Sequence, residues 1–218
     1  MPDCIFVKNY IAPPIDKKEI LRYVGCQGEA DERTNALLDE CLSLCDFAYR
    51  VCYRTMPVSA LQKTLGQDVG KLALRRLCGA EYAVVFAATL GVEADRLLLR
   101  YAATSTAKAA MLQAIGAERI ESLCNVFCKD LQTEWEERGY AVGVRFSAGY
   151  GDFPLQKQKE IFVLLDCERK IVLTLNESLL MSPTKSVTAI VPIGREKIEE
   201  KTGCATCGKT DCTARKNE

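Results

Sequence analysis

The order of the expected elements most constrains the fold of this 218-residue chain. Apolar residues at helical spacing dominate the first two thirds, and a β-rich region with short connections follows. The regular alternation of strands and helices that marks a doubly wound fold does not occur. We therefore expect an α+β fold, a single domain in which long helices flank a twisted sheet that is mixed or antiparallel.

Two segments have the clearest strand patterns. Residues 82–89 are rich in Val and Ala and stop near Gly91, which predicts a buried strand. Residues 186–193 alternate and place Val187, Ala189 and Val191 on one face of a second strand. Further strands are expected at residues 4–11, 51–58, 140–146 and 170–175.

The strongest helical pattern covers residues 117–138, where apolar side chains recur at steps of three and four. Trp135 ends that stripe and is expected in the core. The preceding segment, 93–115, is rich in Ala and Leu, and we expect Gly116 to separate the two helices. Asp16 is expected to cap a short helix to residue 24. Further helices are expected at residues 32–50, 67–77 and 154–165.

The composition excludes several kinds of chemistry, because the chain has no histidine and 12 cysteines. Ser/His and Cys/His catalysis and His-ligated metals are ruled out, so any proton transfer would need a perturbed carboxylate, Cys or Lys. Basic and acidic residues number 29 each, which gives no argument for nucleic acid or an anionic membrane as partner. A signal-peptide pattern and an apolar run long enough to cross a bilayer are both lacking, so a cytoplasmic location is expected.

The run from Arg145 to Pro154 has the residue types of a ligand site. Arg145, near a strand end, can donate two parallel hydrogen bonds to a carboxylate. Gly149 and Gly151 permit positive φ and a close approach of a ligand to the backbone. Between them, Tyr150 offers a ring face to a cation or a flat base, and a hydroxyl to a polar group. This set suits a small zwitterionic ligand.

Either Asp152 or Glu177 can balance positive charge on such a ligand. The same run also fits a tight strand-to-helix turn, with Arg145 on the surface and Tyr150 packed over the core. Short glycine motifs are weak signals, so the residues alone leave both interpretations open.

A second run helps to choose between them. Asn176-Glu177-Ser178 is followed by Met181-x-Pro183-x-x-Ser186-Val187. Together with Arg-x-x-x-Gly-Tyr and a helix opened by Pro154, this order resembles the activation domain of cobalamin-dependent methionine synthase. The similarity is specific over residues 142–193 and looser over 82–138. The N-terminal third and the tail are more similar to short stand-alone relatives than to the C-terminal module of the full-length enzyme.

The resemblance implies a domain that binds S-adenosylmethionine and docks over a cobalamin domain whose cofactor has been oxidised to cob(II)alamin. An electron from flavodoxin or ferredoxin, coupled to methyl transfer from S-adenosylmethionine, would restore the methylated cofactor for methionine biosynthesis. The chain would then be a component of a methyltransferase, whose partner protein holds the cobalamin, rather than a self-sufficient enzyme.

Residue by residue, the resemblance assigns Arg145 to the methionine carboxylate and Gly149 and Tyr150 to the wall of the site, with Ala148 as a backbone contact. Glu121, on the 117–138 helix, and Glu177 are the candidate acids. No acid stands six residues before Arg145, and no aromatic residue follows the last strand as it does in the family. These departures leave a second hypothesis, a docking scaffold for a corrinoid protein that does not bind S-adenosylmethionine.

The remaining motif is a cysteine-rich tail. We expect the activation-like domain to cover residues 1–194, with its motif-rich part at 140–193, and the charged tail to cover 195–218. Cys204, Cys207 and Cys212 have spacing suited to zinc or an iron–sulfur cluster with an unseen fourth ligand, or to an electron-transfer accessory. A reduced, flexible tail fits equally well. Cysteine pairs four apart on helices, 41/45 and 124/128, are expected to pack in the core.

Overall fold

The computed structural model of the protein describes residues 4–26, 28–66 and 68–196. Its centre is a five-stranded sheet in the order β1-β2-β3-β7-β4, and every neighbouring pair is antiparallel. These strands are β1 (Phe6–Tyr10), β2 (Tyr49–Pro57), β3 (Tyr82–Thr89), β4 (Ala141–Val142) and β7 (Ser186–Gly194). A separate hairpin pairs β5 (Thr174–Leu175) with β6 (Met181–Ser182). The expected α+β class is confirmed, with the antiparallel form of the sheet.

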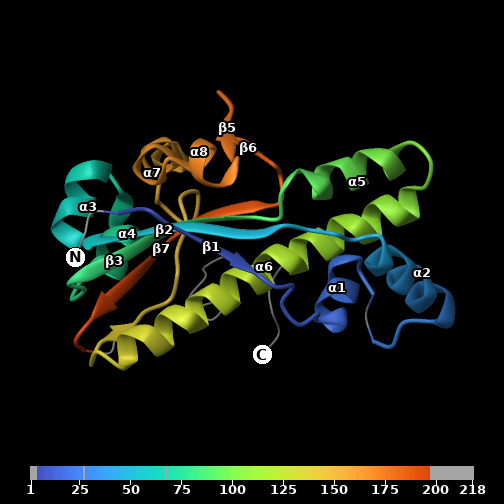
Figure 1. The fold of residues 1–218 in the computed structure, drawn as a ribbon, viewed down its shortest axis with the longest axis horizontal. Helices are drawn as coiled ribbons and strands as arrows, with labels where there is room; N and C mark the ends of the chain where they lie inside the picture. The colour runs from blue at the N-terminus through green and yellow to red at the C-terminus, as the bar shows by residue number, and fades with distance from the viewer. Residues whose placement is uncertain (1–3, 27, 67, 197–218) are drawn as a thin grey trace.

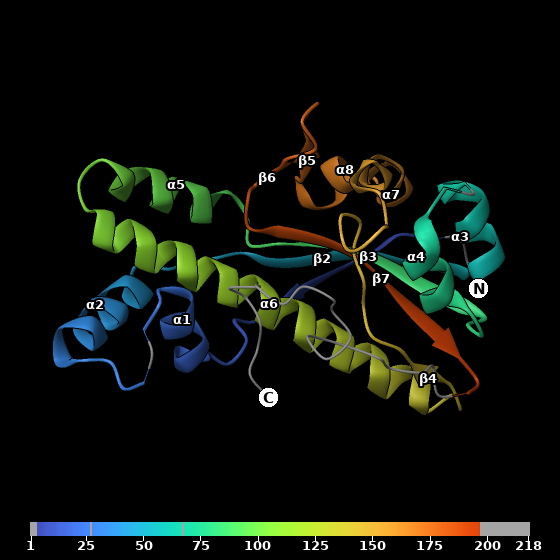
Figure 2. The same ribbon diagram turned by 180° about the vertical axis from the view of Figure 1, so that it is seen from behind.

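Helices cover both faces of this sheet (Figure 1). On one side lies α6, and on the other lie α3, α4, α7 and α8. Figure 2 shows α1, α2 and α5 gathered along the amino-terminal half of α6. The helices are α1 (Lys17–Tyr23), α2 (Glu32–Ser43), α3 (Val58–Leu65), α4 (Gly70–Leu77), α5 (Val92–Ala102), α6 (Thr106–Glu136), α7 (Gln158–Leu165) and α8 (Cys167–Ile171), and a 3-10 turn, Leu155–Lys157, precedes α7. No helix within the described residues has both the length and the apolar character needed to cross a membrane.

The strand β3 explains why the sheet needs cover on both sides. Its residues from 83 to 89 are all buried. Val84 and Phe86 pack toward α6, whereas Val85 packs into the opposite cluster with α3, α4 and α7. A continuous apolar run, rather than an alternating one, is what two covered faces require. On the α6 side, the ring centroids of Phe86 and Phe127 are 4.8 Å apart.

The two clearest strand expectations are confirmed. The expected strand at 82–89 is β3, and the one at 186–193 is β7. On β7, Ala189 and Val191 are fully buried against α6, with Val187 partly buried beside them. Trp135 is in the core as expected, where it contacts the rings of Tyr82 and Tyr140.

The expected helix break at Gly116 is wrong. The helix α6 runs unbroken for 31 residues, and the chain instead turns at residues 103–105, where Ser105 caps α6. Gly116 serves a packing purpose, because a Cβ there would lie 2.8 Å from Cε of Lys185. The absence of a side chain thus admits the Lys185 stem against the helix.

Other boundaries differ from the sequence pattern because sheet pairing overrides local periodicity. The expected helix at 32–50 ends at Ser43, since residues from Tyr49 onward pair with β1 and β3. In the expected strand at 170–175, the first two residues end α8 and only the last two form β5. The expected strand at 140–146 is reduced to β4 and an isolated bridge at Phe146. The helix α3 was not expected from the sequence.

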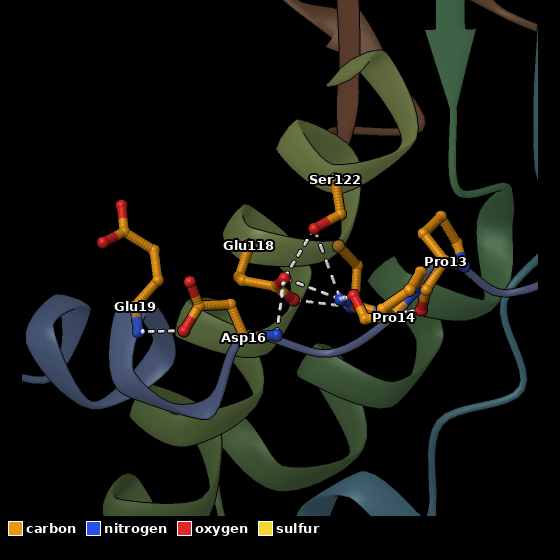
Figure 3. Close-up of polar contacts among 7 residues, drawn as sticks. Pro13, Pro14, Asp16, Glu19, Glu118 and Ser122 are labelled. Carbon is orange, nitrogen blue, oxygen red and sulfur yellow. Dashed lines mark hydrogen bonds and ion pairs between the residues drawn. The ribbon is translucent and has the colours of Figure 1, made fainter. Parts of the chain in front are cut away.

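A buried ion pair fastens the segment before α1 to the middle of α6 (Figure 3). Glu118 and Arg119 are each 2% exposed. From Arg119, Nη1 donates to the carbonyl of Pro13 at 2.6 Å and Nη2 to the carbonyl of Pro14 at 2.7 Å. Burial of a charge is tolerated only when its hydrogen-bonding groups find partners, and here the backbone carbonyls supply them.

The carboxylate of this pair also fixes the start of α1. Glu118 Oε1 accepts a hydrogen bond from the backbone N–H of Asp16 at 3.1 Å. Asp16 in turn caps α1, because its Oδ1 accepts from the N–H of Glu19 at 3.0 Å. The expected cap is therefore present and is itself anchored by α6.

Replacing Glu118 tests this fastening. We expect Glu118→Ala to lower the free energy of unfolding by about 3 kcal/mol, because the buried Arg119 loses its counter-charge. Urea denaturation followed by circular dichroism measures the change. The matched control is Glu134→Ala, which removes an exposed ion pair with Arg138 and should cost less than about 1 kcal/mol. Equal losses in the two variants would contradict this account.

Candidate functional site

The segment between β4 and α7 passes the edge of the sheet at Phe146. This residue exchanges two backbone hydrogen bonds with Ile190 of β7, at 3.0 and 2.8 Å. Adjacent residues of extended chain point to opposite faces. Accordingly, Phe146 packs into the α3/α4/α7/α8 cluster with Phe153, whereas Arg145 lies against α6. Neighbouring residues of the motif therefore lie on opposite faces of the sheet, with Arg145 on the α6 side and Phe146 on the other.

Arg145 is mostly covered, with about 20% of its side chain exposed. Its Nη2 donates to Oε2 of Glu121 at 2.6 Å and to Oδ1 of Asn125 at 3.0 Å. Burial alone would lower the pKa of Arg145, but the influence of Cys124 and then of Glu121 outweighs it and raises that pKa. The guanidinium is therefore a permanent, oriented cation at the edge of the sheet.

Two thiols lie next to this cation. Burial raises the pKa of Cys124 to about 12, and it also raises the pKa of Cys128. Cys41 and Cys124 are fully buried in apolar clusters, as expected for cysteines that pack in the core. Across the described ranges, no three His, Cys, Asp or Glu side chains come together in a way that could hold a metal.

The glycine bend beyond Phe146 presents Tyr150 outward. Gly149 has φ +91°, and its N–H donates to the carbonyl of Phe153 at 2.8 Å. Ala148 is buried in the core, while Tyr150 is 71% exposed. The alternative interpretation, a turn with Arg145 on the surface and Tyr150 packed over the core, is therefore wrong. Arg145 is mostly covered and Tyr150 is exposed.

Asp152 does not act as a free charge. Its Oδ2 accepts from the backbone N–H of Lys71 at 2.7 Å, and its Oδ1 accepts from that of Leu72 at 2.9 Å. The N–H groups of Leu72 and Lys71 lower the pKa of Asp152. This carboxylate, one of the two expected to balance a ligand's charge, instead joins the loop to the first turn of α4.

Glu177 lies apart from these residues. It is exposed in the turn between β5 and β6 and lines a cavity of about 550 Å³ bounded by α7, α8 and that hairpin. Neither Arg145 nor Tyr150 lines that cavity. The structure therefore joins Arg145 to Glu121, keeps Ala148, Gly149 and Tyr150 on one loop nearby in sequence, and places Glu177 at another hollow.

Sequence reasoning missed two contributors. Asn125 follows Glu121 by four residues, so the same helical face carries both, and this spacing could have revealed it. The support from α4 had no sequence signal, because Asp152 and its partners are about 80 residues apart. The tail residues Cys204, Cys207 and Cys212 lie outside the described residues.

Comparison with known proteins defines the class to which this α+β fold with its edge motif belongs. The family described as vitamin B12 dependent methionine synthase, activation domain, matches residues 73–200. Because the match covers more than half of the chain, the protein belongs to this family. The matched span includes Glu121 and the run from Arg145 to Tyr150.

A solved structure supports the fold. The structure described as "Crystal Structure of the MetH Reactivation Domain bound to AdoHcy" aligns with a TM-score of 0.59. The alignment covers 87% of this chain and 78% of that chain at 17% sequence identity, so it establishes likeness of fold alone. No curated protein sequence matched the chain.

Thiol labelling tests the environment of Arg145. With a pKa of about 12, only about one Cys124 in ten thousand is ionised near pH 8, and its burial blocks access as well. We expect iodoacetamide to label the exposed Cys78 quickly and Cys124 slowly, as measured by peptide mass spectrometry over time. Equal labelling rates in the folded protein would show that the helix face under Arg145 is open.

Proposed function

We propose that this protein binds S-adenosylmethionine and supports the reductive remethylation of a cobalamin-dependent methyltransferase such as methionine synthase. Family membership supports the role, and the MetH reactivation domain that shares the fold is described as bound to AdoHcy. The observation that carries the proposal for this chain is Arg145, a covered and permanently charged guanidinium four residues before the glycine bend in the sequence.

The ligand's groups match the residues of this edge. S-adenosylmethionine carries a carboxylate, an ammonium and a sulfonium. Arg145 would receive the carboxylate in place of Glu121, and the displaced Glu121 would then face the ammonium. The backbone of Ala148 and Gly149 would approach the ligand closely, and the exposed ring of Tyr150 offers a surface for the sulfonium or the adenine.

The reaction requires the protein to position the methyl donor and does not require it to transfer a proton. One electron, from flavodoxin or ferredoxin, reduces cob(II)alamin to the cob(I) state on the partner protein. The methyl group then passes from sulfur to cobalt, leaving S-adenosylhomocysteine, and no proton moves. A chain without histidine can serve such a step, because its residues only hold and orient the methyl donor.

A second candidate function is a docking scaffold for a corrinoid protein without S-adenosylmethionine binding. The pairing of Arg145 with Glu121 and Asn125 favours it, since the cation already has partners within the chain. Glu177, which faces a different hollow, also fits this alternative. Association with a corrinoid protein that is indifferent to S-adenosylmethionine would support the scaffold.

A metal-binding or electron-transfer role for Cys204, Cys207 and Cys212 remains a third hypothesis. Metal analysis of anaerobically prepared protein, together with a visible spectrum, tests it. Protein that is free of both zinc and iron would remove this hypothesis without affecting the other two.

Truncating Arg145 tests the ligand assignment. We expect Arg145→Ala to weaken S-adenosylmethionine binding at least about ten-fold, because charge-assisted hydrogen bonds to the carboxylate are lost. Isothermal titration calorimetry measures the affinity, and circular dichroism verifies the fold. Arg138→Ala, which removes an exposed arginine paired with Glu134, is the matched control and should bind like the wild type. Unchanged affinity in Arg145→Ala would remove the assignment.

The function itself is tested by remethylation. A corrinoid methyltransferase inactivated to cob(II)alamin is incubated with reduced flavodoxin and S-adenosylmethionine, with and without this protein. We expect the protein to speed the return of the methylcobalamin absorption spectrum, and we expect no return when S-adenosylmethionine is left out. Identical rates with and without the protein, across several corrinoid partners, would contradict the proposed function.

A further inference from the structure

The bend that carries Tyr150 is attached to α4, an element from a distant part of the chain. Both carboxylate oxygens of Asp152 are engaged there, one by the N–H of Lys71 and one by the N–H of Leu72, at 2.7 and 2.9 Å. The first N–H groups of a helix lack partners within the helix. A carboxylate placed there satisfies two of them and is further favoured by the helix dipole.

Steric contact fixes the same attachment. Gly70, the first residue of α4, has φ +77°, and a Cβ there would lie only 2.2 Å from the carbonyl oxygen of Asp152. On the loop side, a Cβ at Gly151 would lie 2.9 Å from Cδ2 of Leu72. Loop and helix therefore touch at two glycines, and neither position admits a side chain without movement. The hydrogen bonds and the contacts together set one register between them.

This attachment matters because the ring of Tyr150 has little packing of its own. The residues that flank it, Ala148 and Phe153, are buried in the core, and Gly149 bonds to Phe153 across the bend. Tyr150 itself is largely exposed. The backbone sets the point from which this exposed ring projects, and that backbone is held by the core at its two ends and by α4 through Asp152.

We propose that Asp152 is a positioning residue of the ligand site. Its carboxylate docks the 149–151 bend on the amino end of α4 and so sets where Tyr150 and the Gly149 backbone meet the ligand. This inference rests on the proposed binding of S-adenosylmethionine. Its proposed role is to hold the bend rather than to bind the ligand, because each of its oxygens accepts a hydrogen bond from α4. The supporting structure of the site therefore extends to residues 70–72.

Calorimetry on a small set of variants tests the inference. We expect Asp152→Ala to bind S-adenosylmethionine about ten-fold more weakly than the wild type, the effect of losing roughly 1.4 kcal/mol. Asp152→Asn keeps one acceptor oxygen and should fall between the two. Asp68→Ala removes the charge of an exposed carboxylate two residues before α4 and should bind like the wild type. Thermal unfolding of each variant separates affinity from stability.

A double-mutant cycle separates positioning from a merely structural role. If Asp152 acts through the bend, Asp152→Ala should cost clearly less affinity in the Tyr150→Ala background than in the wild type, because Tyr150 is one of the two groups that it positions. Without ligand, Asp152→Ala should also speed hydrogen exchange at the amides of Lys71 and Leu72. Additive losses in the cycle would overturn the inference, because Asp152 would then affect binding by another route.

The outcomes also separate this inference from the proposed function. Wild-type protein that binds S-adenosylmethionine, with both Asp152 variants binding equally well, would overturn the positioning role and leave the proposed function standing. Wild-type protein that binds no S-adenosylmethionine would overturn the proposed function and the positioning role with it. Should Asp152→Ala fail to fold, the Asp152→Asn variant and its cycle with Tyr150→Ala decide the question.

Discussion

Burial of the central sheet on both faces is the constraint on which the rest of this structure depends. The middle strands β3 and β7 are apolar on each side, so neither face can meet water. One face is covered by a single long helix and the other by four short ones. The segment between β4 and α7 bridges β7 at Phe146 and places its neighbouring side chains on different faces. The motif lies along the edge of β7, which β4 pairs with over two residues only.

The electrostatics of that edge are balanced within the chain. Arg145 is paired with Glu121 and Asn125, so a ligand carboxylate would exchange one negative partner for another. Such an exchange gains little unless the displaced Glu121 finds a cation. In the proposed function the ligand's own ammonium supplies one, which favours a zwitterion over a simple anion. Glu121 thus competes with the ligand's carboxylate for Arg145, and the ligand must carry a cation to replace that pairing.

The sequence carried the parts of this arrangement that depend on local pattern. The strands β3 and β7 and the apolar stripe of α6 were predicted because burial leaves a periodic trace. Gly116 led to a wrong prediction of a helix break. A glycine occupies this position because the aliphatic chain of Lys185 packs against it. The first residues of β2 continue a helical pattern in the sequence, but they form a strand because they pair with β3. For the site, the residue types indicated Arg145, and the resemblance added Glu121. The role of Asp152 could not be predicted, because its partners are fixed only when the chain folds.

The buried ion pair of Glu118 and Arg119 limits where this domain can be truncated. The family match begins at residue 73, yet the carbonyls that hold Arg119 belong to Pro13 and Pro14. The strand that pairs with β3 along most of its length also precedes the match. A fragment trimmed to the recognisable family region would uncover a charged pair one helical turn from Glu121 and expose one edge of β3. The segment before the family match therefore supplies the contacts that hold α6 and β3, the two elements that support the candidate site.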